Sequence, residues 1–214
     1  MPAEPHLPAL NVAWTRRTLI EALSHALRHH PEEITATFEH TVENLNNQTN
    51  NMLNQAFIAE LKHEAASTKR ILEKVPEGKF DWKPHEKSMT LGRLTSHVAE
   101  LPGFLNSILT MDDFDFTKGD YKRSHANTPE ELMNVFQQKL DEVVHTLENT
   151  SDEKMNANFT LRSGDHVIAT IPRKVAVRSM ALNHIIHHRG QIAVYLRLLD
   201  IPVPGMYGPS ADEM

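Results

Sequence analysis

Four segments of the chain repeat apolar residues every three or four positions, which is the spacing of one face of an α-helix. The pattern predicts helices over about 54–75, 89–110, 129–147 and 174–199. An amphipathic helix is stable only when its apolar stripe is buried, so the four helices should pack on one another. The sequence therefore predicts an all-α fold, a four-helix bundle.

Local signals mark where these helices begin and what separates them. Thr128 followed by Pro129 and Glu131 forms an N-cap, a proline in the first turn and a capping-box glutamate. Pro102 lies inside the second helix and predicts a kink or a local break. Residues 158–172 alternate around Ser-Gly-Asp, which favours a short β-hairpin between helices three and four.

The first 51 residues lack any periodic pattern that continues into the bundle. Three prolines fall in the first eight residues, a helix-compatible stretch runs from about Trp14 to His29, and an Asn-rich stretch, NLNNQTNN, comes after it. We expect residues 1–51 to be a poorly ordered N-terminal appendage and linker with one short helix, and residues 52–214 to be the bundle. Met52, at this boundary, is an alternative start position that the pattern leaves open.

Composition excludes several classes of function. The net charge is −6 and no block of Lys or Arg interrupts the mixed pattern, which argues against a nucleic-acid surface. The chain has no cysteine, so it has no disulfide, no cysteine-ligated zinc and no thiol nucleophile of its own. No apolar run approaches the roughly 18 residues of a membrane span, and no signal peptide is evident. We therefore expect a cytoplasmic protein that binds neither nucleic acid nor membranes.

The 14 histidines are the one unusual feature of the composition. A helix advances about 100° per residue, so each histidine can be placed relative to the apolar stripe of its helix. His97 falls in the middle of the stripe of helix two, and His184 and His188 share the inward face of helix four. His63 and His145 fall opposite the stripes of their helices and should face solvent.

Three inward histidines favour a divalent-metal site. A lone buried histidine is usually a satisfied core residue, but each unpaired ring nitrogen costs about 1–3 kcal/mol, and a shared metal satisfies three at once. His184 and His188 have the His-x-x-x-His spacing of zinc metalloproteases. The intervening residues Ile185, Ile186 and His187 supply no catalytic glutamate, so a metalloprotease is excluded.

The residues that carry this pattern resemble a known family. The stretches FDWKPHEKSMTLGRLTSHVAELP (80–102), ALNHIIHHRGQIAVYLRLLDIPVPG (181–205) and YGPSADE near the C-terminus are similar to the DinB-like (YfiT-like) metalloenzymes. The resemblance covers roughly residues 52–214. It implies a four-helix bundle in which His97, His184 and His188 bind a divalent metal, and some relatives are transferases or isomerases that use a low-molecular-weight thiol.

Such a site predicts two classes of function. Three neutral ligands leave an open coordination position, which is typical of catalytic sites. The first hypothesis is a metal-dependent transferase or hydrolase that activates a substrate thiol or water, with zinc, nickel or iron as the metal and a small-molecule substrate. The second is a non-catalytic, metal-containing binding or sensing module related to stress. A homodimer is an open alternative to a monomer.

Six further residues are candidates for supporting roles, each with a structural role as the alternative. Asn183, Gln191 and Tyr195 are expected near the ligands, where they would orient the histidine rings. The candidates for the mouth of a pocket are Trp82, His85 and Glu100.

Overall fold

The computed structural model describes residues 32, 35–36, 39–41, 52–119 and 124–214. The chain divides into two compact units, Met1–Thr49 and Asn50–Met214. The six described residues of the first unit are helical and exposed. The helix expected from Trp14 to His29 lies outside the described residues. The helices and strands given below all belong to the second unit.

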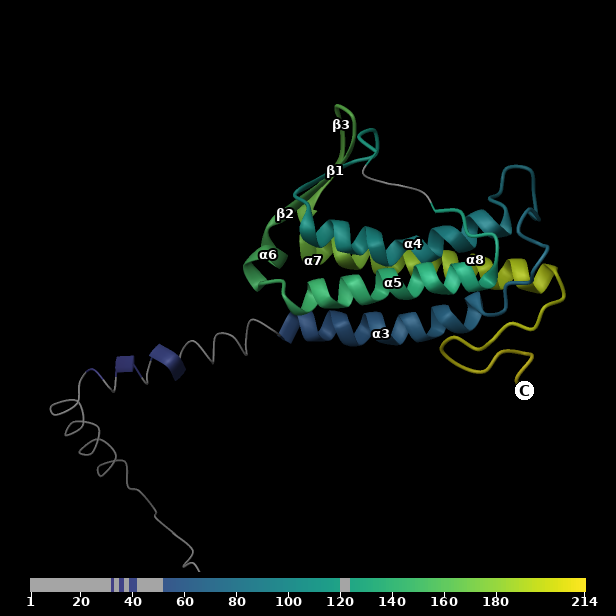
Figure 1. Ribbon diagram of the computed structural model, residues 1–214, viewed down its shortest axis with the longest axis horizontal. Coiled ribbons are helices and arrows are strands. Elements are labelled where there is room, and N and C mark those ends of the chain that lie inside the picture. Colours follow the sequence, from purple (N-terminus) through teal and green to yellow (C-terminus); the bar gives the residue numbers. More distant parts are fainter. Residues whose placement is uncertain (1–31, 33–34, 37–38, 42–51, 120–123) are drawn as a thin grey trace, which may run out of the picture. The chain divides into compact units, whose positions relative to one another are not determined.

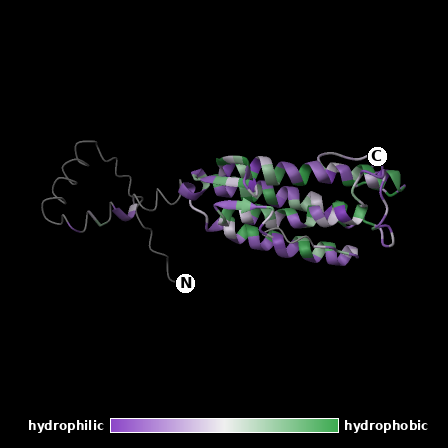
Figure 2. Cartoon of the chain, turned by 90° about the horizontal axis from the view of Figure 1, so that it is seen from above, coloured by the Kyte–Doolittle hydropathy of each residue, from purple (hydrophilic) through white to green (hydrophobic). Residues whose placement is uncertain are grey.

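The second unit is mostly helical. Its long helices are α3 (Met52–Leu72), α4 (Leu91–Thr110), α5 (Pro129–Glu148) and α8 (Asn183–Leu198). Helix α3 contacts α5 and α8, and α4 also contacts α5 and α8, so the helices lie alongside one another (Figure 1). The apolar stripes predicted from the sequence meet between them: Leu61, Leu94, Leu132 and Ile192 are all buried. Green and purple residues alternate along each helix in Figure 2, as expected of amphipathic helices.

Polar caps begin two of these helices as their sequences require. The Thr128 hydroxyl accepts a hydrogen bond from the Glu131 N–H at 3.1 Å, and the Glu131 carboxylate accepts from the Asn127 N–H at 2.7 Å. In a standard capping box the glutamate accepts from the N–H of the N-cap residue, whereas here it accepts from the residue before the N-cap. Thr90 caps α4 in the same way, because its hydroxyl accepts from the Arg93 N–H at 3.1 Å.

The structure differs from the predicted helices in two details. The sequence predicted a kink or a local break at Pro102, and helix α4 continues through this residue without a break. A proline removes one backbone hydrogen bond, but the buried Leu101 and Phe104 beside it hold the helix in the core. The fourth helix is not uniform: α7 (Arg173–Ala176) is followed by a π-helical segment, η1 (Val177–Leu182), and then by α8.

A small three-stranded sheet lies at one end of these helices (Figure 1). Its strands are β1 (Asp113–Asp115), β2 (Asn158–Ser163) and β3 (His166–Pro172), in the order β1-β2-β3. The β2 and β3 strands pair antiparallel, as the alternation in the sequence indicates, with a bulge at Leu161/Arg162. The β1 strand pairs parallel with β2 and was not predicted, because three residues are too few to show an alternating pattern. The short helix α6 (Asp152–Asn156) precedes β2.

Asp115 fastens the end of β1 to the turn between β2 and β3. One of its carboxylate oxygens, Oδ1, accepts from the Thr117 N–H at 2.9 Å, the Thr117 hydroxyl at 2.8 Å and the Gly164 N–H at 2.9 Å. The two backbone hydrogen bonds, first that of Gly164, lower the pKa of Asp115 to about 2. The carboxylate is therefore charged, and this turn is fixed, at any physiological pH.

Arg189 holds α8 against α3. Its side chain is 2% exposed, and its Nη2 lies 2.6 Å from Oε2 of the buried Glu64. Its Nη1 donates to the Glu64 carbonyl at 2.9 Å. The Tyr207 hydroxyl, from the C-terminal segment, donates to the same Glu64 oxygen at 2.8 Å. The pair thus joins two helices and the C-terminal segment at one buried point.

Arg173 joins the sheet to the helices in a comparable way. Its side chain is 1% exposed, and its guanidinium donates to the carbonyls of Ile108 at 3.1 Å, Met111 at 2.9 Å and Asn158 at 3.0 Å. It also forms an ion pair with Asp112. These carbonyls lie at the end of α4 and the start of β2, where regular secondary structure leaves them without partners.

No helix of the described part of the chain combines the length and the apolar character that a membrane span requires.

We predict that Arg173→Met destabilises the protein by about 2 kcal/mol or more, because it leaves buried carbonyls without donors. For a domain of this size the melting temperature should fall by roughly 4–8 °C. Arg178→Met is the matched control, because Arg178 is 52% exposed and its ion pair with Glu60 lies at the surface. Equal melting temperatures for the two variants would show that Arg173 does not hold the sheet in place.

Candidate metal centre

The rings of His97, His184 and His188 converge on one point between α4 and α8. Nε2 of His184 lies 3.4 Å from Nε2 of His97 and 2.8 Å from Nε2 of His188. One ligand nitrogen from each ring lies within 4.8 Å of the other two. The side chain of His97 is 15% exposed and His188 is 8% exposed. The structure therefore brings together the three histidines that the helical faces selected.

These separations suit a shared metal ion. With metal–nitrogen bonds of about 2.0–2.1 Å and angles of about 90–109°, neighbouring ligand nitrogens lie roughly 2.8–3.4 Å apart. The 3.4 Å between the Nε2 atoms of His97 and His184 and the 2.8 Å between those of His184 and His188 are the two ends of this range. Two neutral imidazoles can share one proton between their facing nitrogens, whereas three facing nitrogens are satisfied together by one cation. The cluster can hold a metal ion.

The outer nitrogens of two rings are fixed by hydrogen bonds. Nδ1 of His188 donates to the side-chain oxygen of Gln191 at 2.6 Å. The ring of His184 donates to the backbone carbonyl of Met180, and because Nε2 faces the cluster, the donor is Nδ1. Each bond leaves a lone pair on Nε2, directed at the other rings. This is the tautomer that a metal-binding imidazole needs.

Burial keeps these rings neutral. Removal from water is the main cause that lowers the pKa of His184, and the neighbouring His188 lowers it further. Burial is also the main cause that lowers the pKa of His188, although its hydrogen bond to Gln191 acts in the opposite direction. Since only the neutral ring binds a metal, the folded site is ready to bind near neutral pH.

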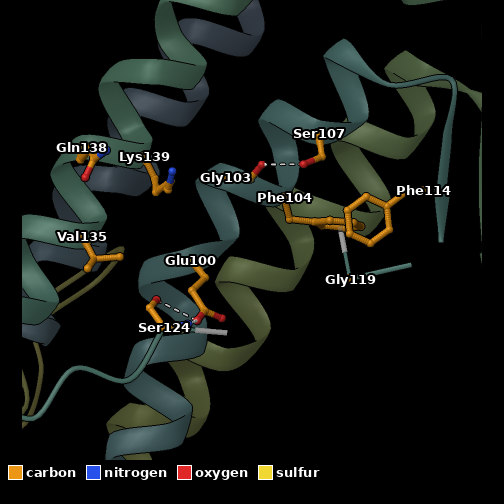
Figure 3. A pocket seen from close by; sticks show the side chains of 10 residues that line it. All are labelled: Glu100, Gly103, Phe104, Ser107, Phe114, Gly119, Ser124, Val135, Gln138 and Lys139. Carbon is orange, nitrogen blue, oxygen red and sulfur yellow. Dashed lines mark hydrogen bonds between the residues drawn. The ribbon is translucent and has the colours of Figure 1, made fainter. Parts of the chain in front are cut away.

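Glu100 is a buried carboxylate beside His97. Its Oε2 lies 4.0 Å from Nδ1 of His97 and 3.6 Å from Nη1 of Arg93. Its Oε1 accepts hydrogen bonds from the hydroxyl, at 2.8 Å, and the backbone N–H of Ser124. Figure 3 shows this contact at a cavity of about 500 Å³ between α4 and α5, which Lys139 also lines. Glu100 thus lines a cavity whose described wall includes none of the three histidines, and it is held by polar partners.

The other candidates divide into two groups. Gln191 contacts a cluster ring directly, and Asn183 lines a cavity together with His184. Tyr195 and Trp82 pack edge to face with centroids 5.6 Å apart, and the Tyr195 hydroxyl donates to the Met89 carbonyl at 3.2 Å. His85 is exposed and accepts from the Lys87 N–H within its own loop. These last three have structural contacts.

The histidines placed on outer faces are exposed. His63 on α3 and His145 on α5 both face solvent. His187 is exposed too, with its ring centroid 4.9 Å from that of His188. The Met180 carbonyl could not be predicted as a partner of His184, because that contact arises in the π-helical segment, and an extra residue in a helical turn leaves no periodic signal.

A profile of the DinB family matches residues 45–214. This chain belongs to the DinB family. Two curated proteins are similar in sequence. Uncharacterized protein YrdA of Bacillus subtilis strain 168 is 24% identical over 162 residues, which are 73% of this chain and 89% of YrdA. Uncharacterized protein YjoA of the same strain is 23% identical over 133 residues, which are 61% of this chain and 80% of YjoA.

Solved structures have the same fold as this DinB protein. A DinB-like protein from Bacillus cereus ATCC 10987 superposes with a TM-score of 0.58 and 21% identity, covering 72% of this chain and 97% of that one. The DinB-like protein YjoA from Bacillus subtilis gives a TM-score of 0.55 and 18% identity, covering 69% and 96%. At these identities the likeness concerns the fold alone, a mostly helical DinB-like fold.

The lowered pKa values predict how the stability of the metal-free protein depends on pH. An unfolded histidine has a pKa of about 6.5, so as pH falls the unfolded chain takes up protons before His184 and His188 do. Their contribution is therefore complete above about pH 6.5 and is lost as pH falls through the lower folded-state values. Denaturant unfolding between pH 7.5 and 5 should show the loss, and the double variant His184→Gln/His188→Gln should lose less. If the free energy of unfolding of that variant depended on pH as in the unaltered protein, His184 and His188 would not be the source of the loss.

Proposed function

We propose that His97, His184 and His188 bind one divalent metal ion, and that the protein is a metal-dependent transferase or hydrolase acting on a small molecule. The observation that supports this most is the meeting of three Nε2 atoms, with the outer nitrogens of His184 and His188 already occupied as donors. Imidazole ligands suit zinc, nickel, iron and copper alike, and we propose zinc, nickel or iron as the metal.

The chain supplies binding and orientation. Gln191 and the Met180 carbonyl hold two rings with Nε2 directed inward, and burial keeps both rings unprotonated. When bound, a divalent ion with three histidine ligands and an open position lowers the pKa of a coordinated water or thiol toward neutrality. Since the chain has no cysteine, a reacting thiol must come with a substrate, such as a low-molecular-weight thiol.

The proposal includes the architecture that presents the site. Residues 52–214 form a DinB-like four-helix bundle, with a β-hairpin of β2 and β3 between the third helix and the fourth. Residues 1–51 are an N-terminal appendage and linker outside this bundle. In that arrangement one ligand comes from the second helix and two come from the fourth. We further propose that the protein acts in the cytoplasm, as a monomer or homodimer, without nucleic-acid or membrane partners.

One observation favours a second candidate, a non-catalytic metal-containing binding or sensing module. Glu100, the carboxylate beside His97, already interacts with Ser124 and Arg93. A carboxylate whose oxygens are already engaged by neighbouring side chains is not free to reach a substrate proton, so it is poorly placed to act as a general base. Catalysis would then depend on acid–base groups brought by the substrate.

We predict that the purified protein carries about one zinc, nickel or iron ion per chain, and that His184→Ala and His188→Ala each remove most of it. His63→Ala and His145→Ala are the matched controls, because they make the same change at exposed positions on α3 and α5. Elemental analysis of each variant, after circular dichroism confirms folding, measures the metal content. Equal metal loss in all four variants, or none in any, would contradict the three-histidine site.

Turnover separates the two candidate functions. We expect the metal-loaded protein to accelerate attack of a low-molecular-weight thiol on an activated electrophile such as 1-chloro-2,4-dinitrobenzene, or hydrolysis of an activated ester. The rate should fall at least about tenfold after chelation and return when metal is restored. A protein that binds stoichiometric metal but accelerates neither reaction across a panel of thiols and esters would favour the non-catalytic module.

A further inference from the structure

A second cavity, of about 450 Å³, opens directly beside the histidine cluster. His184 forms part of its wall, and Met180, whose carbonyl orients His184, forms another part. The remaining apolar wall consists of Phe104 from α4, Leu161 from β2 and Phe116, which comes directly after β1. The cavity is therefore an open pocket bordered by the helices that carry the cluster and by the sheet.

The aromatic side chains at this cavity pack against one another in a defined geometry. The rings of Phe104 and Phe114 pack edge to face with centroids 5.3 Å apart, and Phe114 and Phe116 do the same at 5.4 Å. Phe104 and Phe114 are buried, whereas Phe116 is 47% exposed. An exposed phenylalanine costs hydrophobic free energy that a bound apolar group would recover.

The position of Phe116 is fixed by the sheet. Asp115, the residue before it, holds the Thr117 N–H and the Gly164 N–H on one carboxylate oxygen at 2.9 Å each. Because this turn is anchored on both sides of Phe116, the ring is presented to the cavity without an ordering step. A preformed apolar wall binds its ligand with a smaller entropic cost than a loop that must order first.

The charge of this cavity differs from that of its neighbour. Apart from the imidazoles of His184 and His187, none of the described residues that line it has an ionisable side chain. The cavity in Figure 3, by contrast, has Glu100 and Lys139 in its wall. Phe104 lines both cavities and separates them. A neutral, apolar group fits the cavity beside His184, since a charged group would lose its water shell there without gaining a partner.

We infer that this cavity binds the apolar portion, aliphatic or aromatic, of a ligand whose reactive head lies at the histidine cluster. The inference rests on the proposed function, which it deepens by naming the substrate class: a small molecule with a neutral apolar group a few bonds from its thiol or electrophilic atom. Phe116 determines specificity, because it is the half-exposed ring of the wall. The cluster recognises the head of the ligand, and Phe116 recognises its apolar end.

The first experiment tests the cavity without any metal. The full-length, metal-stripped protein, labelled with 13C at its methionine methyl groups, is titrated with benzyl alcohol. The Met180 resonance, assigned with Met180→Leu, should shift and saturate, while that of Met155, which is 0% exposed in the core, should not. Phe116→Ala should weaken this binding about fivefold or more, Phe116→Leu should restore most of it, and Leu198→Ala should change nothing. Leu198 is an exposed apolar residue of α8 outside the cavity.

The second experiment connects the cavity to the cluster. Cobalt-loaded protein is titrated with benzyl mercaptan and with 2-mercaptoethanol, two thiols of similar acidity, and thiolate coordination is measured by its charge-transfer absorption. We expect benzyl mercaptan to bind about tenfold more tightly, and Phe116→Ala to remove most of that preference while leaving 2-mercaptoethanol unaffected.

The outcomes separate the inference from the proposed function. A Met180 resonance that does not saturate, or equal affinity for the two thiols, overturns the inference and leaves the metal site intact. If neither thiol coordinates, thiol activation at the cluster is wrong, and the Met180 titration still decides whether the cavity binds apolar groups. A preference for benzyl mercaptan that survives Phe116→Ala also overturns the inference.

Discussion

The rotation of α8 about its own axis determines whether its histidines face His97 on α4. The buried ion pair between Arg189 and Glu64 fixes that rotation. Successive helical residues turn by about 100°, so Arg189 can face α3 while His188, one position earlier, faces α4. The guanidinium donates both to the Glu64 carboxylate and to its backbone carbonyl. Breaking a buried ion pair costs about 3–5 kcal/mol, so α8 has little freedom to turn.

The fixed rotation of α8 keeps the uncharged rings of His184 and His188 close to the ring of His97. His184 and His188 lie one turn apart on α8, and His97 reaches them from α4. Burial removes each ring from its hydrogen bonds to water. One such bond is replaced on His188 by Gln191 and on His184 by the Met180 carbonyl. Tyr207 connects the C-terminal segment to this ion pair, because its hydroxyl donates to Glu64, so that segment supports the site through α8.

The sequence predicted those parts of the molecule that depend on periodicity. The buried stripes and the inward direction of His97, His184 and His188 arise from repeats of three to four residues, and the exposed His63 obeys the same rule. The cap at Thr128 was predicted from local side-chain chemistry instead. The three-residue strand β1 was not predicted, because it carries no repeat and forms only through pairing with β2. The wall of the second cavity was missed for a related reason: Phe104, Phe116 and Leu161 are distant in sequence, and only the packing of the sheet on α4 brings them together.

The π-helical segment from Val177 to Leu182 has a consequence for how relatives should be compared. A π-turn holds one residue more than an α-turn, so the residues before this segment are rotated by roughly 100° relative to α8. Homologous chains that differ in this turn would differ by a single residue inside a helix, where insertions are not normally expected. An alignment that confines gaps to loops would then place the histidines correctly and misplace Arg173 and the sheet, or the reverse. The length of this one turn must therefore be matched before the site residues of two homologous chains are aligned.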